Sequence, residues 1–301
     1  MSAVREFLVS KLEARVPNAA CAWLEQASRE VAGGVDDVRF AGLISLASRH
    51  VPRDELGFDA AELASAFELC EGWNPARWNA LEAARVVLLL SRPDLSEPSG
   101  ARGVEEAFRY ADVGELCALY RSLALLPAPE RFTWRAGEGC RTSMRAVFEA
   151  AACDTPFPFK HFDEIAWRQL VIKCVFIEAP MWRVFGLDLR VDAELARMAL
   201  DLVEERRSAG RPVPHELWLC LGRSGGARAI ASLEHELAGT DARGRRAAAF
   251  GLARAGELER LTQHLAREND PVVKESMRSA LKGRVQSSAF RDMEQSAACP
   301  S

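Results

Sequence analysis

Apolar residues recur at helical spacing along most of this chain, and proline and glycine interrupt the pattern repeatedly. Near the N-terminus, Val4, Leu8 and Leu12 form one apolar stripe, and Pro17 ends the helix that carries it. Alternating apolar and polar runs bounded by Asn-Gly or Asp-Gly turns, which are typical of β-hairpins, are absent. The pattern therefore predicts an all-α fold of antiparallel helices joined by short turns.

Further segments carry the signals that begin and end helices. Asp112 and Glu115 have capping-box spacing at the start of one helix, and Pro127 follows its end. Asp192 caps another, which ends at "SAGRP" (208–212) with a glycine and a following proline. Between them, the spacing predicts one helix that opens at Glu130 and turns four residues inward: Ala136, Cys140, Met144 and Val147.

The C-terminal part is repetitive. "TDARGRRAAAFGLA" (240–253) aligns with "NDPVVKESMRSALK" (269–282), which places Asp241 over Asp270 and Ala248 over Met277. Helix pairs that repeat in this way resemble HEAT-like units, because one pair cannot bury its own apolar face and copies must stack. The predicted fold class is thus all-α, with stacked antiparallel helix pairs (an α-solenoid) that end in HEAT-like repeats.

The same patterns suggest a division of the chain. We expect an N-terminal helical region (1–111), a helical core (112–222), the HEAT-like repeats (223–283) and a loose tail (284–301), with 1–283 forming one continuous helical domain.

Charge and composition exclude several classes of protein. The net charge of −4 and the pI of about 5.9 give no general attraction to nucleic acid or anionic lipid. Charged residues interrupt the N-terminus, so no signal peptide is predicted, and no apolar run is long enough to span a bilayer. We therefore expect a cytoplasmic protein.

The eight cysteines show no C-x-x-C motif and no zinc-ligand spacing with histidine. Cys117, Cys140 and Cys174 fall in apolar helical rows, which predicts buried reduced thiols, whereas Cys299 lies in a polar tail and is expected to be exposed. Neither a metal nor a cofactor is predicted.

The segment "PFPFKHFDEIAWRQLVIKCVFI" (156–177) places polar residues in an otherwise apolar stretch. The spacing predicts a helix that starts near Phe162, with one polar stripe that contains Glu164, Arg168 and Lys173. Trp167 falls on the apolar remainder. Such a stripe faces either solvent or a cavity, which makes these residues candidates for binding a ligand or partner.

Several blocks resemble the EboA family, the metabolite-traffic proteins of bacterial ebo gene clusters. These blocks lie within residues 112–222 and include "LYRSLALLPAPERF" (119–132), "MRAVFEAAACDTPFP" (144–158), "FDEIAWRQLVIK" (162–173), "FGLDLR" (185–190) and "ELARMALDLVEERRSAGR" (194–211). The sequence departs from the family pattern at Arg168, where asparagine is usual, and at Arg207, where tryptophan is usual.

The resemblance implies a soluble helical protein with no assigned catalytic residues. It also implies partners among the products of the same gene cluster, which include a membrane prenyltransferase-like protein and sugar-phosphate-type enzymes. A small-molecule metabolite and a peripheral membrane partner are further expectations.

Some of these polar residues could take part in chemistry, as metal ligands or as an acid–base pair, or they could have a purely structural role. His161, Asp163 and Glu164 have the donor types for a metal, but adjacent carboxylates diverge on a helix, so helix capping is favoured. Lys173 with Glu164 or Glu178 could form either a buried acid–base pair or a structural ion pair.

The last four candidates bracket the helix that begins after Asp192. They are interpreted as either inter-helix salt bridges or ligand contacts: Asp188, Arg190, Glu205 and Arg206.

The resemblance, the missing catalytic motif and the repeat architecture together favour a non-enzymatic adaptor or binding protein. The resemblance implies that such a protein takes part in the traffic of a secondary metabolite or lipid-linked precursor towards the membrane or periplasm. Two alternatives stay open: an accessory enzyme of a cyclitol or prenyl-lipid pathway with an Asp/Glu/Lys pocket, and a purely structural protein–protein scaffold.

Overall fold

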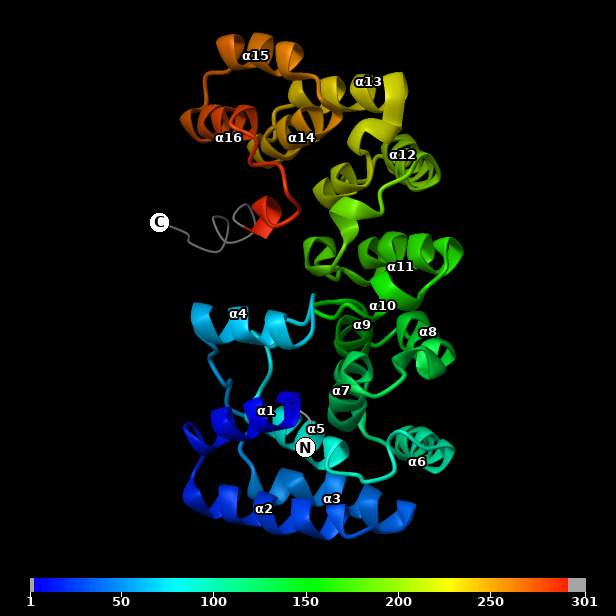
Figure 1. Cartoon of the computed structure of the whole chain (residues 1–301). Coiled ribbons are helices and arrows are strands. Elements are labelled where there is room, and N and C mark those ends of the chain that lie inside the picture. The colour runs from blue at the N-terminus through cyan, green and yellow to red at the C-terminus, as the bar shows by residue number, and fades with distance from the viewer. Residues whose placement is uncertain (1–2, 292–301) are drawn as a thin grey trace. The chain divides into compact units, whose positions relative to one another are not determined.

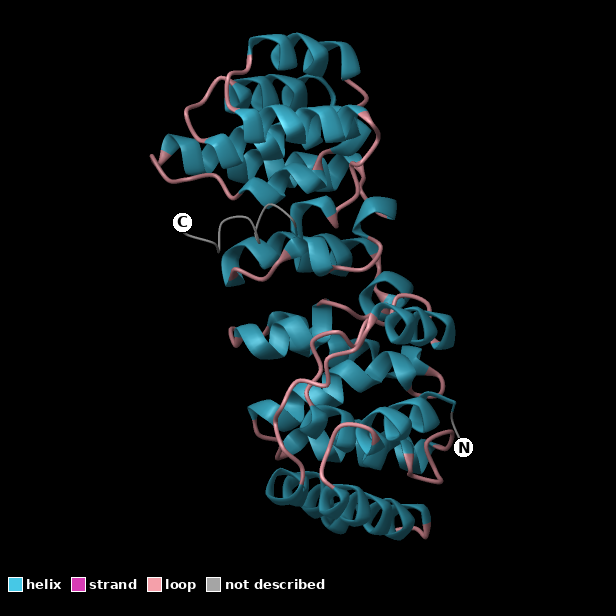
Figure 2. Ribbon diagram, turned by 90° about the vertical axis from the view of Figure 1, so that its left-hand side faces the viewer, coloured by secondary structure: helices cyan, strands magenta, loops and turns pink. Residues whose placement is uncertain are grey.

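The computed structural model describes residues 3–291 of the 301-residue chain, and in that range the fold is all-α, as predicted (Figure 1). Figure 2 shows helices joined by loops. Strand-like pairing in the described range is limited to one isolated bridge, between Glu55 and Asn79. None of the helices within residues 3–291 is both long and apolar enough to cross a membrane.

The chain divides into two compact units between Ala166 and Trp167. This division falls in the first turn of helix α11 (Glu164–Ile177). The domain boundaries expected from the sequence, at residues 111/112 and 222/223, remain predictions.

The N-terminal unit contains ten α-helices before α11 and two 3₁₀ helices within its described residues. They are α1 (Ala3–Glu13), α2 (Asn18–Ala32), α3 (Asp37–His50), α4 (Ala60–Leu69), α5 (Ala80–Leu90), α6 (Pro98–Arg109), α7 (Val113–Ser122), η1 (Leu123–Leu125), η2 (Pro129–Phe132), α8 (Thr133–Arg141), α9 (Arg145–Ala152) and α10 (Phe157–His161).

Helix α5 is the centre of the N-terminal unit. All eleven of its residues are buried, and α1, α2, α3 and α7 pack around it (Figure 1). Two of the buried residues are charged, and each has a partner from α7: Arg121 donates to Glu82, and Arg85 donates to Glu115. Burial lowers the pKa of Arg85, although Glu115 opposes the shift. The pairing keeps two charges in a helix that would otherwise be apolar throughout.

Capping boxes begin three helices of this unit. The predicted box of Asp112 and Glu115 is confirmed at α7, because the side chain of each residue accepts a hydrogen bond from the backbone N–H of the other. The same reciprocal pattern begins α4 and α5. Each box satisfies two of the backbone N–H groups that the first turn of a helix leaves unpaired.

The helix predicted from Glu130 to Val147 is wrong as a single element. It is divided into η2, α8 and α9, with a break between Arg141 and Arg145. Met144, which was expected to face inward, is 43% exposed in that break, whereas Ala136, Cys140 and Val147 are buried. Helical spacing carried across a break keeps the inward phase for most residues but misplaces the one in the turn.

The C-terminal unit continues α11 with four 3₁₀ helices and five α-helices in its described part. They are η3 (Met181–Arg183), η4 (Leu187–Leu189), α12 (Ala193–Ser208), η5 (His215–Cys220), η6 (Gly222–Gly225), α13 (Gly226–Leu237), α14 (Ala242–Ala255), α15 (Leu258–Arg267) and α16 (Pro271–Leu281).

The sequence repeat matches two helices that pack against each other. Asp241 caps α14 and Asp270 caps α16, each by accepting two backbone N–H groups. Ala248 and Met277 are both buried where α14 contacts α16. The repeat is therefore real at the level of caps and inward positions, whereas its assignment to the HEAT class remains a prediction.

The segment after α16 makes specific contacts as far as it is described. Phe290 is buried, and its ring lies 5.9 Å from that of Phe250. The rest of the expected loose tail, with Cys299, lies outside the described residues. The seven cysteines within the described range are free thiols, and Cys117, Cys140 and Cys174 are buried as predicted.

Candidate functional site

The first three predicted site residues lie at the end of the N-terminal unit, around the start of α11. Asp163 is exposed, and its carboxylate accepts the backbone N–H of Ala166, so it caps the helix rather than lying in its first turn. Glu164 is exposed at the first helical position. The His161 ring packs against Phe157, with 4.8 Å between centroids, and burial lowers the pKa of the imidazole.

Helix α11 and the chain before α12 are joined by two arginine contacts. Arg168 donates to the Asp192 carboxylate, with 3.0 Å between Nε and Oδ2, and this bond lowers the pKa of Asp192. The Arg190 guanidinium lies over the ring of the buried Trp167, 4.7 Å from its centroid. Asp192 also caps α12, so one carboxylate fixes both the cap and the ion pair. These contacts hold helices together.

The second departure from the EboA pattern has a similar explanation. Arg207 donates to Glu236 and to Ser232, and its guanidinium lies over the Trp218 ring. Both departures thus introduce an arginine that pairs with a carboxylate of a neighbouring element.

Lys173 is half-buried on α11. Glu164 and Glu178, the two carboxylates considered for an acid–base pair with it, are both exposed. Neither therefore provides the buried partner that desolvation-tuned catalysis needs.

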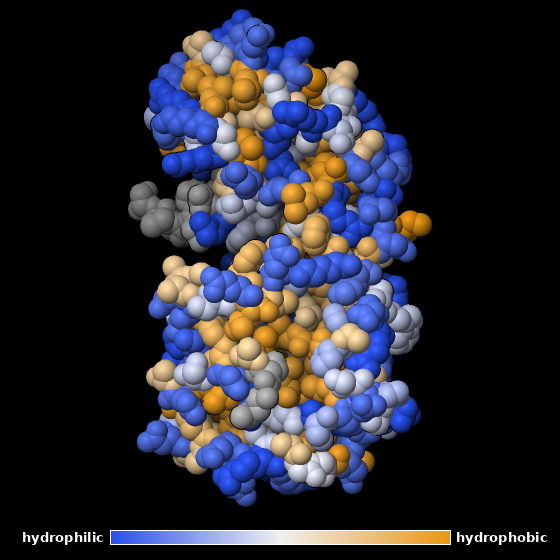
Figure 3. All heavy atoms as spheres, in the orientation of Figure 1, coloured by the Kyte–Doolittle hydropathy of each residue, from blue (hydrophilic) through white to orange (hydrophobic). Residues whose placement is uncertain are grey.

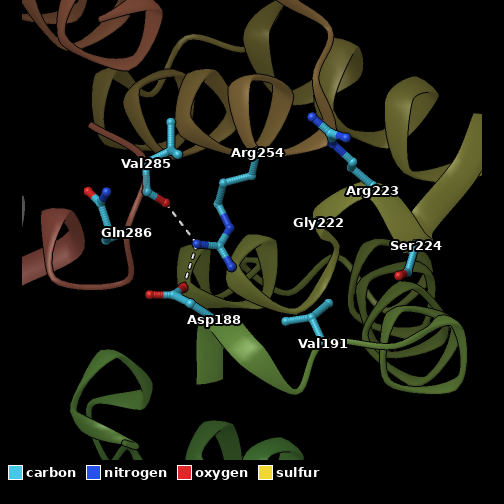
Figure 4. A pocket seen from close by; sticks show the side chains of 8 residues that line it. All are labelled: Asp188, Val191, Gly222, Arg223, Ser224, Arg254, Val285 and Gln286. Atoms are coloured by element: carbon cyan, nitrogen blue, oxygen red, sulfur yellow. Dashed lines mark hydrogen bonds and ion pairs between the residues drawn. The ribbon is translucent and has the colours of Figure 1, made fainter. Parts of the chain in front are cut away.

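Asp188 lies apart from these residues, in the lining of a cavity of about 370 Å³ in the C-terminal unit (Figure 4). Its carboxylate accepts hydrogen bonds from Arg254, at 2.6 Å, and from the backbone and hydroxyl of Ser287, both at 3.0 Å. Arg254 also donates to the carbonyl of Val285. The charges that face this cavity therefore tie the end of α14 to the segment after α16.

Glu205 and Arg206 lie near the C-terminal end of α12. Arg211 approaches Glu205 at 3.9 Å, and Arg206 donates to the Pro212 carbonyl at 3.4 Å. These are local contacts around the end of one helix. The structure places Arg190 over Trp167, next to Arg168 in the chain, whereas the contacts described for Asp188, Glu205 and Arg206 lie elsewhere.

No group of three histidine, cysteine, aspartate or glutamate side chains suited to a metal occurs within the described residues. A small-molecule site must therefore be sought among the cavities.

Two cavities of the N-terminal unit share Arg5 and Ser28 in their linings. The first, which we call the α1–α2 chamber, has about 330 Å³ and lies between those helices. The second, which we call the arginine–serine chamber, has about 630 Å³ and reaches the end of α5 and residues 90–96. We refer to the two together as the N-terminal cleft. Figure 3 shows apolar surface gathered over the middle of this unit.

Polar groups from α1, α2 and the end of α5 meet where the chambers adjoin. Arg5 Nε donates to Ser91 Oγ at 2.8 Å, and that hydroxyl donates to the Val87 carbonyl at 2.7 Å. Ser28 is 3% exposed, and its hydroxyl has no hydrogen-bond partner in the described part of the chain. A buried hydroxyl without a partner costs stability, which makes it notable in a cavity wall.

Half of the residues that line the α1–α2 chamber are apolar. Leu12 and Leu24 are buried in its wall, and the two carboxylates of the lining, Glu13 and Glu25, are exposed. Burial raises the pKa of the Cys21 thiol, so this sulfur is neutral at physiological pH. The chamber therefore offers a surface for an apolar group.

The sequence-based prediction missed this cleft. The sequence contains one indication of the cleft, which is Ser28. This polar residue occupies a core position on the apolar stripe of α2 that also carries Leu24 and Val31. Arg5 and Ser91 lie 86 residues apart in the chain, and no spacing rule connects them.

Comparison with protein-family models gives one finding. A model described as "Metabolite traffic protein EboA" matches residues 4–222. The match extends further towards the N-terminus than the blocks within 112–222 suggested. The whole N-terminal cleft lies inside it, whereas the cavity of Asp188 and Arg254 reaches past its end. Neither the curated proteins nor the solved structures contain a match to the chain.

Proposed function

Because the chain belongs to the EboA family of metabolite traffic proteins, we propose that it binds a small metabolite in the N-terminal cleft and carries it without chemical change. The observation that supports this most is the buried Ser28 hydroxyl. It has no partner among residues 3–291, and it lies in the wall of two cavities inside the family-matched region.

The dimensions of the cleft suit a metabolite. Each chamber falls within the range of about 300–1,000 Å³ that is usual for small-molecule sites. Buried leucines provide apolar surface, and a few polar groups converge where the chambers adjoin. This mixture of broad apolar contact and few polar groups is typical of ligand pockets.

The proposed cargo is a secondary metabolite or a lipid-linked precursor on its way to the membrane or periplasm. The proposed partners are products of the ebo gene cluster, including a membrane prenyltransferase-like protein and sugar-phosphate-type enzymes, which would supply or receive the cargo. Family membership supports this part of the proposal. A pulldown from cells that express the whole cluster tests it, and failure of every cluster protein to copurify contradicts it.

Cargo binding is tested by copurification. The protein is isolated from cells that express the cluster, small molecules are extracted from it, and the extract is compared by mass spectrometry with that of an Ala22→Trp variant. Ala22 is exposed and lines the α1–α2 chamber, so an indole there fills the chamber without entering the core. Ala19→Trp is the matched control, because Ala19 is exposed on the same helix outside the chamber lining.

We expect a small molecule that accompanies the wild type and Ala19→Trp and is lost from Ala22→Trp. If no small molecule copurifies, or if the indole at position 22 does not reduce it, the cleft is not the cargo site.

A further inference from the structure

The lining of the arginine–serine chamber has a selective composition. Among the described residues it contains three arginines, three serines and five apolar residues, and no carboxylate. The six polar residues are Arg5, Arg29, Arg92, Ser28, Ser91 and Ser96. Guanidinium and hydroxyl groups are the side chains that bind phosphate and carboxylate oxygens, so this lining is built for hydrogen-bond acceptors that carry negative charge.

The three arginines differ in how far they are committed within the protein. Arg92 is buried and donates to both Asp37 and Asp94, so its charge is largely used in the structure. Arg29 is exposed and meets Glu25 at 3.4 Å, and exposed pairs of this kind hold their partners weakly. Arg5 donates to a neutral hydroxyl of Ser91. Arg5 lines both chambers, and Arg29 is held only weakly by its partner, so these two arginines are the groups best placed to bind an anion.

Ser28 adds a second and independent indication. The residue is only 3% exposed, and no described residue forms a hydrogen bond with its hydroxyl. A hydroxyl can donate one hydrogen bond and accept others. A ligand oxygen in the chamber would satisfy it, and the free protein would regain a stabilising interaction when the ligand binds.

Apolar residues form the rest of the chamber wall. Leu90 and Leu95 are buried, and Pro93 and Pro127 also line the cavity. The neighbouring α1–α2 chamber continues with Leu12 and Leu24. One ligand can therefore meet charged and apolar walls at the same time.

From this lining we infer that the cleft binds an amphipathic anion. Its phosphate or carboxylate head lies against Arg5, Arg29 and Ser28, and its hydrocarbon part lies along the leucines. The inference rests on the proposed function, since it names the chemical class of the cargo.

The experiment uses the full chain and four probes that share one eight-carbon chain below its micelle concentration. Octyl phosphate and octanoate carry the two candidate head groups, whereas 1-octanol and octyltrimethylammonium carry a neutral and a cationic one. Binding is measured by isothermal titration calorimetry, and inorganic phosphate alone is titrated as the head without the tail.

We expect the two anions to bind at least tenfold more tightly than octanol, and the ammonium to bind no better than octanol. Inorganic phosphate alone is expected to bind at least tenfold more weakly than octyl phosphate, because it lacks the apolar contact. The better of octyl phosphate and octanoate identifies the head group.

Two variants locate the site. Arg5→Gln removes one charge-assisted hydrogen bond and should weaken octyl phosphate binding by about tenfold. Ala32→Trp fills the chamber from an exposed position on α2 and should abolish binding. The matched control for the first is Arg49→Gln, because Arg49 is an exposed arginine of α3 outside either lining, and the control for the second is Ala19→Trp.

The failures of the two proposals are distinguishable. If octanol binds as tightly as the anions and Arg5→Gln has no effect, the inferred anionic head is wrong, while the cleft can still be a cargo site. If no probe binds, the inference is likewise wrong, and copurification with Ala22→Trp decides separately whether the cleft carries a metabolite. Thermal unfolding of each variant confirms that it is folded.

Discussion

Replacement of Ser28 by alanine should make the free protein more stable. The hydroxyl is buried on α2 and has no partner among the residues that the structure describes, and an unsatisfied buried polar group costs about 1–3 kcal/mol. Alanine also favours the helix interior over serine by a few tenths of a kcal/mol, up to about 0.5. The lost van der Waals contacts of one oxygen atom offset part of this gain. We therefore expect a net stabilisation of about 1 kcal/mol.

Urea unfolding followed by far-UV circular dichroism measures this effect as a higher midpoint at unchanged slope. In thermal unfolding, about 1 kcal/mol corresponds to a rise of roughly 2–4 °C for a unit of this size. Ser122→Ala is the matched control. Ser122, the last residue of α7, is buried like Ser28, but its hydroxyl donates to the Leu119 carbonyl at 2.7 Å. The free energy of unfolding of Ser122→Ala should therefore fall by about 1 kcal/mol.

The two serine variants should thus shift stability in opposite directions. If Ser28→Ala destabilises the protein as much as Ser122→Ala does, the Ser28 hydroxyl has a partner in the free protein, and the main support for the cleft is lost. If Ser28→Ala stabilises the free protein and also weakens octyl phosphate binding, stability has been exchanged for binding at this position, as is common at functional sites.

Three further predictions concern the remaining structure. The Arg15 guanidinium lowers the pKa of Glu62 from 4.5 to about 2, so the associated stability is present above pH 4.5 and is lost as pH falls towards 2. Glu62→Gln should therefore flatten the decline of the urea midpoint between pH 4.5 and 2, and an unchanged decline would argue against the pairing. Arg254→Ala should remove the bonds to Asp188, Val285 and the Leu219 carbonyl, and limited proteolysis after Arg284 should become at least tenfold faster. Arg223→Ala, an exposed arginine of the same cavity, should leave that rate unchanged, and equal effects would contradict the tethering role of Arg254. Arg168→Gln should destabilise by about 1 kcal/mol through loss of the Asp192 contact, with octyl phosphate affinity unchanged, whereas a tenfold loss of affinity would place α11 in the binding site.

Residue spacing in the sequence predicted helix caps and the buried faces of helices, which depend on interactions between residues close together in the chain. The capping box at Asp112, the cap at Asp192 and the buried phase of Trp167 all follow from spacing within a few residues, and all are present. The same logic failed at Met144, because spacing alone does not reveal the break between α8 and α9 in which this residue lies.

Contacts between distant segments could not be predicted in this way. The stripe on α11 was visible in the sequence, but the position of Arg168 against Asp192 depends on how the chain returns after η4. The cleft depends on Arg5, Ser28 and Ser91, which come from α1, α2 and the end of α5 and are brought together only by the tertiary structure. Ser28, a polar residue on the apolar stripe of α2, was visible in the sequence. Only the tertiary structure shows that it lies in the wall of a cavity.

Hydrogen–deuterium exchange tests the central claim most directly, with the small molecule that copurifies with the protein added back to the stripped chain. If the cargo lies in the N-terminal cleft, amide protection should rise in peptides that cover α1, α2 and residues 90–96, and exchange in α11 and α12 should not change. Protection confined to α11 and α12, or to the repeats from α13 to α16, would contradict the account.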